Sequence, residues 1–94
     1  MFLGAIDQSG TLPVHIATMT DGVRDPDAMF DLGLQYANGR AVPLDLVAAH
    51  KWFNLAAAKG KKEAVVLRRE VAEQMSESDI AMAQREAREW LTSH

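Results

Sequence analysis

Cysteine is absent from all 94 residues. Disulfide bonds, thiolate nucleophiles and cysteine-ligated zinc are therefore excluded for this chain. Long apolar runs are also missing, since a membrane-spanning helix needs about 20 such residues. The first ten residues, MFLGAIDQSG, lack a basic cluster and reach Asp7 early, unlike a secretory signal. We therefore expect the protein to stay in the cytoplasm, away from membranes.

The sequence has little excess charge of either sign. Its formal net charge is -3, too small to indicate binding to nucleic acid, an anionic membrane or a basic substrate. Hydrophobic residues make up 48% and charged residues 24%, as in ordinary globular chains. Composition and length together predict one small folded domain.

Recognised catalytic and metal-binding motifs are missing as well. His15, His50 and His94 are far apart, and none has a second ligand at a known metal-motif spacing. Asp27 and Asp31 are four residues apart, but both fall in the first turns of a predicted helix, where negative charge is favourable in any case. We therefore expect no enzyme activity, no metal, no cofactor and no small-molecule substrate.

Residues 1–24 are predicted to form an extended arm. Leu12, Val14 and Ile16 alternate with other residues, a period of two that is typical of extended chain. Pro13 removes a backbone donor, which favours an edge or a docked arm over a central strand. The apolar anchors of this arm are Phe2, Leu3, Ile6, Leu12, Val14 and Ile16.

The first helix is predicted between two capping residues. Asp25 can cap the start, Pro26 suits the first helical position, and Gly39 can take the left-handed conformation that ends a helix. Apolar residues cover most of its circumference, so it needs neighbours on two sides. Those residues are Ala28, Met29, Phe30, Leu32, Gly33, Leu34, Tyr36 and Ala37.

A second helix is predicted from the cap Asp45 to Ala58 or Lys59, with Gly60 as its stop. One inner face is expected, which the hairpin with the first helix can satisfy, while His50 lies at the edge of this face. The inner face consists of Leu46, Ala49, Trp52, Phe53, Ala56 and Ala57. Two antiparallel helices with a short connection form an αα-hairpin.

Two more helices are predicted in the C-terminal part. The third spans Lys61 to Gln74, and Ser76 then caps the fourth in a capping-box pattern. The third should bury Ala64, Leu67, Val71 and Met75 or a neighbour. The fourth should bury Ile80, Ala83, Ala87, Trp90 and Leu91.

The stretch from Ala28 to Ala64 resembles one Sel1-like repeat, a relative of the tetratricopeptide repeat. The matching positions are Ala28, Leu32, Gly33, Tyr36, Gly39, Val42, Asp45, Ala49, Trp52, Ala56, Ala57, Gly60 and Ala64. Ala41 departs from the pattern, because the family often places a second glycine there. The following MSESDIAMAQREAREW is similar to the tail that often closes bacterial members of the family. The resemblance implies an α-helical module for protein–protein contacts, with packing residues and no catalytic ones.

The predicted architecture is therefore all-α: an arm (1–24) and a helical domain (25–94), which divides into a repeat hairpin (25–60) and a capping helix pair (61–94). Phe30, Leu34 and Ala37 form the side of the first helix that no preceding repeat covers. Either the arm, a protein partner or a second copy of the chain should cover this face.

The expected function is that of a non-enzymatic adaptor, scaffold or regulator in a bacterial cell. Two alternatives stay open. One is a small DNA-binding protein that uses the third and fourth helices, although acidic Glu77 and Asp79 at the start of the fourth count against it. The other is a non-catalytic subunit of an enzyme.

Overall fold

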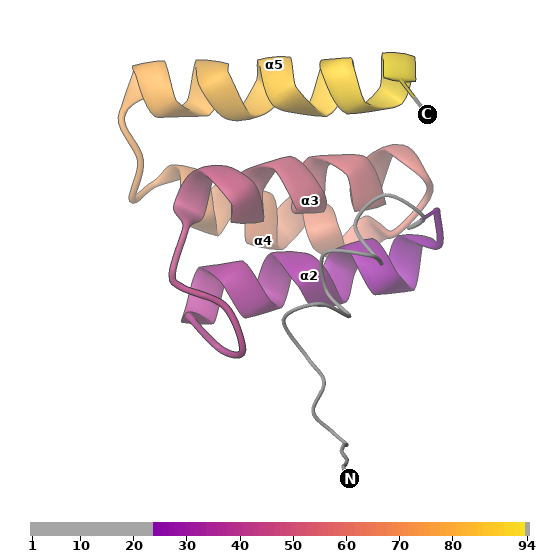
Figure 1. The fold of residues 1–94 in the computed structure, drawn as a ribbon, viewed down its shortest axis with the longest axis horizontal. Coiled ribbons are helices and arrows are strands. Elements are labelled where there is room, and N and C mark those ends of the chain that lie inside the picture. Colours follow the sequence, from indigo (N-terminus) through magenta and orange to yellow (C-terminus); the bar gives the residue numbers. More distant parts are fainter. Residues whose placement is uncertain (1–23, 94) are drawn as a thin grey trace, which may run out of the picture.

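The computed structural model describes residues 24–93, and this part of the chain is all-helical, without a strand (Figure 1). The predicted arm, apart from Arg24, lies outside the described residues. No helix within residues 24–93 combines the length and apolar character needed to span a membrane. The helices are α2 (Pro26–Asn38), α3 (Leu46–Ala58), α4 (Lys62–Ala72) and α5 (Glu77–Ser93).

Helix α2 begins and ends as its capping residues predict. Asp25 is extended, and its Oδ2 accepts a hydrogen bond of 3.1 Å from the backbone N–H of Ala28. Gly39 has φ 66°, in the left-handed region, and the next N–H, from Arg40, donates to the carbonyl of Gln35 at 2.9 Å. Both ends therefore satisfy backbone groups that a helix leaves unpaired.

The turn between α2 and α3 holds one strained residue. Ala41 has φ 69°, a conformation that costs a residue with a Cβ roughly 1–2 kcal/mol. This is the position where the Sel1-like pattern often has glycine, so the departure adds strain without preventing the turn. Asp45 then caps α3, because its Oδ1 accepts from the N–H of Ala48 at 3.0 Å.

The two later turns also use local capping. Gly60 has φ 104°, and the N–H groups of Gly60 and Lys61 donate to the carbonyls of Ala57 and Ala56, both at 3.0 Å. This pair of bonds is the Schellman arrangement that closes a helix. At the start of α5, the N–H of Asp79 donates to Ser76 Oγ at 3.1 Å.

Helix α3 is the centre of the fold. The other three helices each make their main contacts with it, and Figure 1 shows α2 and α5 on opposite sides of α3, with α4 behind it. Its buried residues lie on several faces: Ala49, His50, Trp52, Phe53, Leu55 and Ala56. The expectation of a single inner face for this helix is wrong, because three helices surround it.

Helix α2 is less enclosed than its apolar composition predicts. Only Met29, Leu32 and Gly33 are buried. Gly33 permits a very close approach to α3, since a Cβ at this position would lie 2.5 Å from the Phe53 ring. Phe53 is itself 1% exposed, so its ring has little room to yield.

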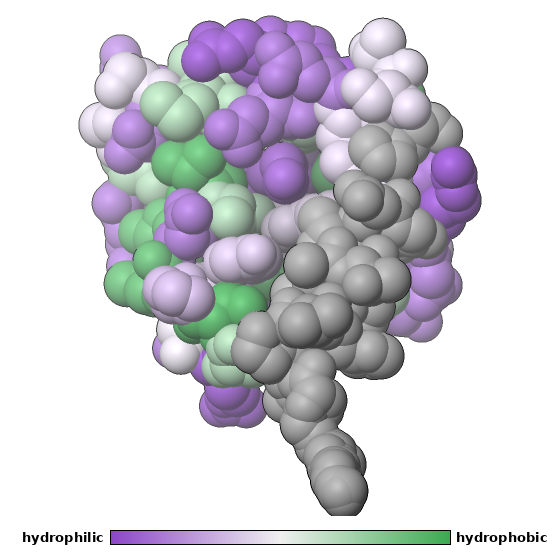
Figure 2. Space-filling model, viewed as in Figure 1, coloured by the Kyte–Doolittle hydropathy of each residue, from purple (hydrophilic) through white to green (hydrophobic). Residues whose placement is uncertain are grey.

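Helix α5 contributes a narrow apolar stripe. Ala83, Ala87 and Trp90 are buried as predicted, and the Trp90 ring meets that of Trp52 edge-on, with centroids 5.8 Å apart. Leu91 was expected to be buried, but it is 46% exposed. The reason is that α5 makes its main contacts with α3 alone, so its outer side remains at the surface. Figure 2 shows that the surface along the top, over α5, is mainly hydrophilic.

Candidate protein-binding groove

Phe30, the first residue of the predicted open face, is half-buried within the chain. Its ring lies 5.7 Å from that of Phe53, centroid to centroid, at an interplanar angle of 53°. The Lys61 Nζ is 5.2 Å from the Phe30 ring centroid, in cation–π range. Residues of α3 and of the turn before α4 thus cover this end of the face.

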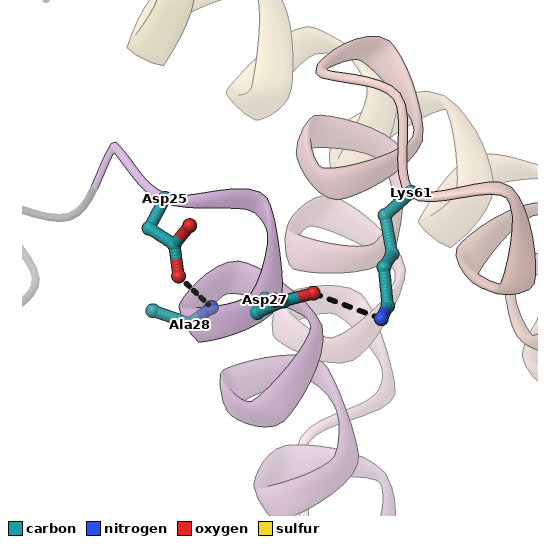
Figure 3. A network of polar contacts seen from close by, with 4 residues as sticks. All are labelled: Asp25, Asp27, Ala28 and Lys61. Carbon is teal, nitrogen blue, oxygen red and sulfur yellow. Dashed lines mark hydrogen bonds and ion pairs between the residues drawn. The ribbon is translucent and has the colours of Figure 1, made fainter.

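An ion pair fastens the same end. Lys61 Nζ lies 2.8 Å from Asp27 Oδ1, which joins the start of α4 to the first turn of α2 (Figure 3). The hydrogen bond to Asp27 raises the pKa of Lys61 above its ordinary value. Asp27 therefore has a structural partner. No group of three His, Cys, Asp or Glu side chains within residues 24–93 could hold a metal ion.

The other end of the face is a groove between α2 and α4, with α3 as its floor. We call this feature the α2/α4 groove; its volume is about 180 Å³. Leu34 and Ala37, the remaining residues of the predicted face, both line it and are half-buried. The full lining is Leu34, Ala37, Asn38, Leu46, Phe53, Leu67, Glu70, Val71 and Gln74.

The rim of the α2/α4 groove is polar and includes one carboxylate, that of Glu70. Asn38, Glu70 and Gln74 are exposed there, around the apolar floor. Asn38 ends α2, Glu70 lies in the last turn of α4, and Gln74 follows α4 by two residues. Helix C-termini carry partial negative charge. Helix α2 has no basic residue in its last turn to offset this charge, whereas α4 has Arg69 there. The rim therefore offers amide groups and acceptors to a bound polypeptide.

A second hollow adjoins the groove across α2. It has a volume of about 270 Å³ and is lined by Asp31, Leu34, Gln35, Asn38 and Arg40. Leu34 and Asn38 line both hollows, so the surface around the end of α2 is continuous. Gln35 Oε1 is buried and accepts no hydrogen bond from the part of the chain that the structure describes.

His50 is buried, although the sequence places it at an edge. It is 3% exposed, and its Nδ1 has no hydrogen-bond partner within residues 24–93. Burial, with a smaller contribution from the charge of Arg68, lowers the pKa of His50. Arg68 itself donates from Nη1 to Asn54 Oδ1 at 2.7 Å. His50 is thus a core residue for which burial favours the neutral form; His15 and His94 lie outside the described residues.

The residues that match the repeat pattern are distributed between core and turns. Gly39, Asp45 and Gly60 occupy the helix ends described above. Ala28, Tyr36, Val42 and Ala57 are half-buried. The fully buried members are Leu32, Gly33, Ala49, Trp52, Ala56 and Ala64.

The α4 side of the groove was missed at the sequence level. The sequence predicts only a packing role for Leu67 and Val71, yet both also line the groove. In the third helix as predicted, Lys61 to Gln74, Glu70 and Gln74 share the face of Leu67 and Val71, since residues three, four and seven apart lie on one side of a helix. A stripe of mixed apolar and polar residues on the third helix is therefore the sequence signal that could have revealed this side of the groove.

Comparisons of this chain with models of protein families, with curated proteins and with solved structures find no match. The resemblance to a Sel1-like repeat stays a prediction that rests on the spacing of residues 28–64.

Proposed function

We propose that this protein is a non-enzymatic protein–protein interaction module, related to Sel1-like repeats, that binds a polypeptide in the α2/α4 groove. The observation that carries the proposal is a groove lined by half-buried leucines from three helices, Leu34, Leu46 and Leu67, beneath a polar rim. Fully buried contacts surrounded by polar ones are typical of protein interfaces.

The size and lining of the groove support a polypeptide ligand. Sites for small organic ligands usually measure about 300–1,000 Å³, whereas this groove measures about 180 Å³. A few apolar side chains from a partner suit such a volume. Glu70 is the one ionisable side chain in the lining, which favours binding over acid–base chemistry.

The test uses the full chain with one charge placed in the groove. Leu34→Asp introduces a carboxylate that a docked apolar side chain would have to desolvate. Leu91→Asp is the matched control, since Leu91 is also a partly exposed leucine but lies on α5. Sedimentation measures self-association, and cross-linking in cells followed by quantitative mass spectrometry measures partner recovery.

We expect Leu34→Asp to reduce association or recovery by about tenfold or more, equivalent to roughly 1.4 kcal/mol, and Leu91→Asp to leave them unchanged. Circular dichroism checks that both variants remain folded. A rim variant, Gln74→Arg, tests the same groove at an exposed position if Leu34→Asp unfolds. Equal results for groove and control variants would refute the proposal.

A further inference from the structure

We propose that the α2/α4 groove is occupied within the same chain by the N-terminal segment Leu12 to Ile16. The inference depends on the groove being a polypeptide-binding surface, as proposed above. It assigns the groove an internal ligand, which a protein partner would have to displace.

The segment has the pattern that a narrow apolar groove selects. Leu12, Val14 and Ile16 alternate along the sequence LPVHI, so an extended chain places these three side chains on one side. The lining offers the half-buried Leu34, Leu46 and Leu67 to them, above the buried Phe53 and Val71. Pro13 lacks a backbone N–H, but it is compatible with this position in the groove. A chain that lies between two helices needs no ladder of backbone hydrogen bonds to a neighbouring strand.

The rim suits the backbone of such a segment. An extended chain that leaves water must find partners for its N–H and C=O groups. The side-chain amides of Asn38 and Gln74 supply both donors and acceptors, and the Glu70 carboxylate supplies acceptors. The groove thus combines apolar sites with backbone-directed polar groups.

The length of the intervening chain permits this position. The groove lining begins at Leu34, ten residues into the helical part, or about 15 Å along the axis from Arg24 at 1.5 Å per residue. Ile16 lies eight positions before Arg24, and eight extended residues span about 26–29 Å. The segment therefore reaches the groove with enough chain left to pass the Lys61–Asp27 pair.

The short tether also favours the chain's own segment over a second copy. A binding element on a short linker acts at an effective concentration in the millimolar range. A second copy competes only at the total protein concentration, which is far lower in a dilute solution. A weak contact in the groove therefore forms with the segment of the same molecule before it forms with that of a second copy.

This occupancy makes partner binding conditional. A partner that needs an empty groove meets an apparent dissociation constant equal to its intrinsic value divided by the fraction of molecules with the groove empty. Partners with weak affinity are consequently excluded, and substitutions that release the segment should strengthen capture.

The absence of cysteine permits a direct test in the full chain. The double variant Val14→Cys/Glu70→Cys places one thiol in the segment and one at the groove. Its matched control is Val14→Cys/Arg69→Cys, because Arg69 is the adjacent exposed residue of α4 and does not line the groove. Disulfide formation under mild oxidation is followed by intact mass and by gel mobility at low protein concentration.

We expect an intramolecular disulfide in the Glu70→Cys variant at least about tenfold faster than in the Arg69→Cys control, since the bond requires the two Cβ atoms within about 4.5 Å. Equal rates, or no disulfide, would overturn the inference. A disulfide-linked dimer as the main product would also overturn it and would identify a second copy as the occupant.

A companion variant with a single cysteine tests the same contact if the double variants fold differently from the wild type. His15→Cys alone, labelled with a nitroxide on the side of the segment that faces away from the groove, should broaden the methyl NMR signals of Leu34, Leu67 and Val71 more strongly than that of Leu91. Uniform broadening, or none, would contradict the position of the segment in the α2/α4 groove. The disulfide and NMR measurements need no partner and test only whether the segment occupies the groove. The Leu34→Asp experiment tests whether the groove binds a partner. Either result can be positive while the other is negative, so the two proposals are judged separately.

Discussion

Helices α2 and α3 have the same length, 13 residues, but α3 is both the more apolar and the more buried of the two. Helix α2 is apolar around most of its circumference, yet three of its residues are buried. Helix α3 includes His50, Lys51 and Asn54, yet six of its residues are buried, His50 among them. The difference teaches that the number of neighbouring helices acts together with the residues of a helix, since three helices around α3 enclose even the polar His50.

Small residues explain how α3 accommodates its neighbours. Ala49 and Ala56 on α3, Ala64 on α4, and Ala83 on α5 are each 0% exposed. Short side chains at these positions let helix axes approach closely, and the large rings of Trp52 and Phe53 fill the remaining space. Helix α2 has one comparable position, Gly33, and it faces α3.

The largest effect is expected from the central helix. Trp52→Ala removes a side chain that is 1% exposed and should cost about 3–5 kcal/mol of unfolding free energy, enough to unfold a domain of this size. Phe30→Ala, the matched change on α2, should cost clearly less because Phe30 is half-buried. Urea denaturation followed by circular dichroism measures both, and equal losses would contradict the comparison.

An intermediate effect is expected where the two helices touch. Gly33→Ala adds a methyl group against the buried Phe53 ring, and overpacking of this kind costs about 1–3 kcal/mol. The gain in helix propensity offsets about 1 kcal/mol of this loss. We expect a net loss of stability, partly recovered in the double variant Gly33→Ala/Phe53→Leu. A stability equal to or above that of the wild type would show that α2 can move away from α3.

The smallest effect concerns acid sensitivity through His50. Burial lowers its pKa from an ordinary value of 6.5, so the unfolded chain binds a proton at this residue more readily than the folded one. The stability contributed by neutral His50 is therefore present above about pH 6.5 and decreases as the pH falls through the lowered pKa. Urea midpoints at several pH values should show this decrease.

The control for acid sensitivity is His50→Leu. This variant retains His15 and His94 and should lose part of the slope between neutral and mildly acidic pH. An unchanged slope would mean that the other groups of the chain cause the acid response.

Local structure was predictable because its signals are local. Asp25, Gly39, Asp45, Gly60 and Ser76 act at helix ends through their own φ angles or through hydrogen bonds that span a few residues. Such effects depend on adjacent residues alone, so the sequence contains them in full. The all-helical character of residues 24–93 follows from the same signals.

The arrangement of the helices was less predictable. The period of a single helix shows which residues share a face, but it does not show how many other helices will pack against it. This is why His50 was expected at an edge and Leu91 in the core. The α2/α4 groove was likewise invisible, because it depends on α4 folding back beside α2 after Gly60.

The central position of α3 also has a consequence for the order in which the molecule comes apart. Helix α5 makes its main contacts with α3 alone, through the stripe that includes Ala83, Ala87 and Trp90. Its release leaves the α2–α3 and α3–α4 contacts in place, whereas melting of α3 removes all three. Amide hydrogen exchange should consequently divide the protein into an early-opening C-terminal helix and a slower unit built around Trp52.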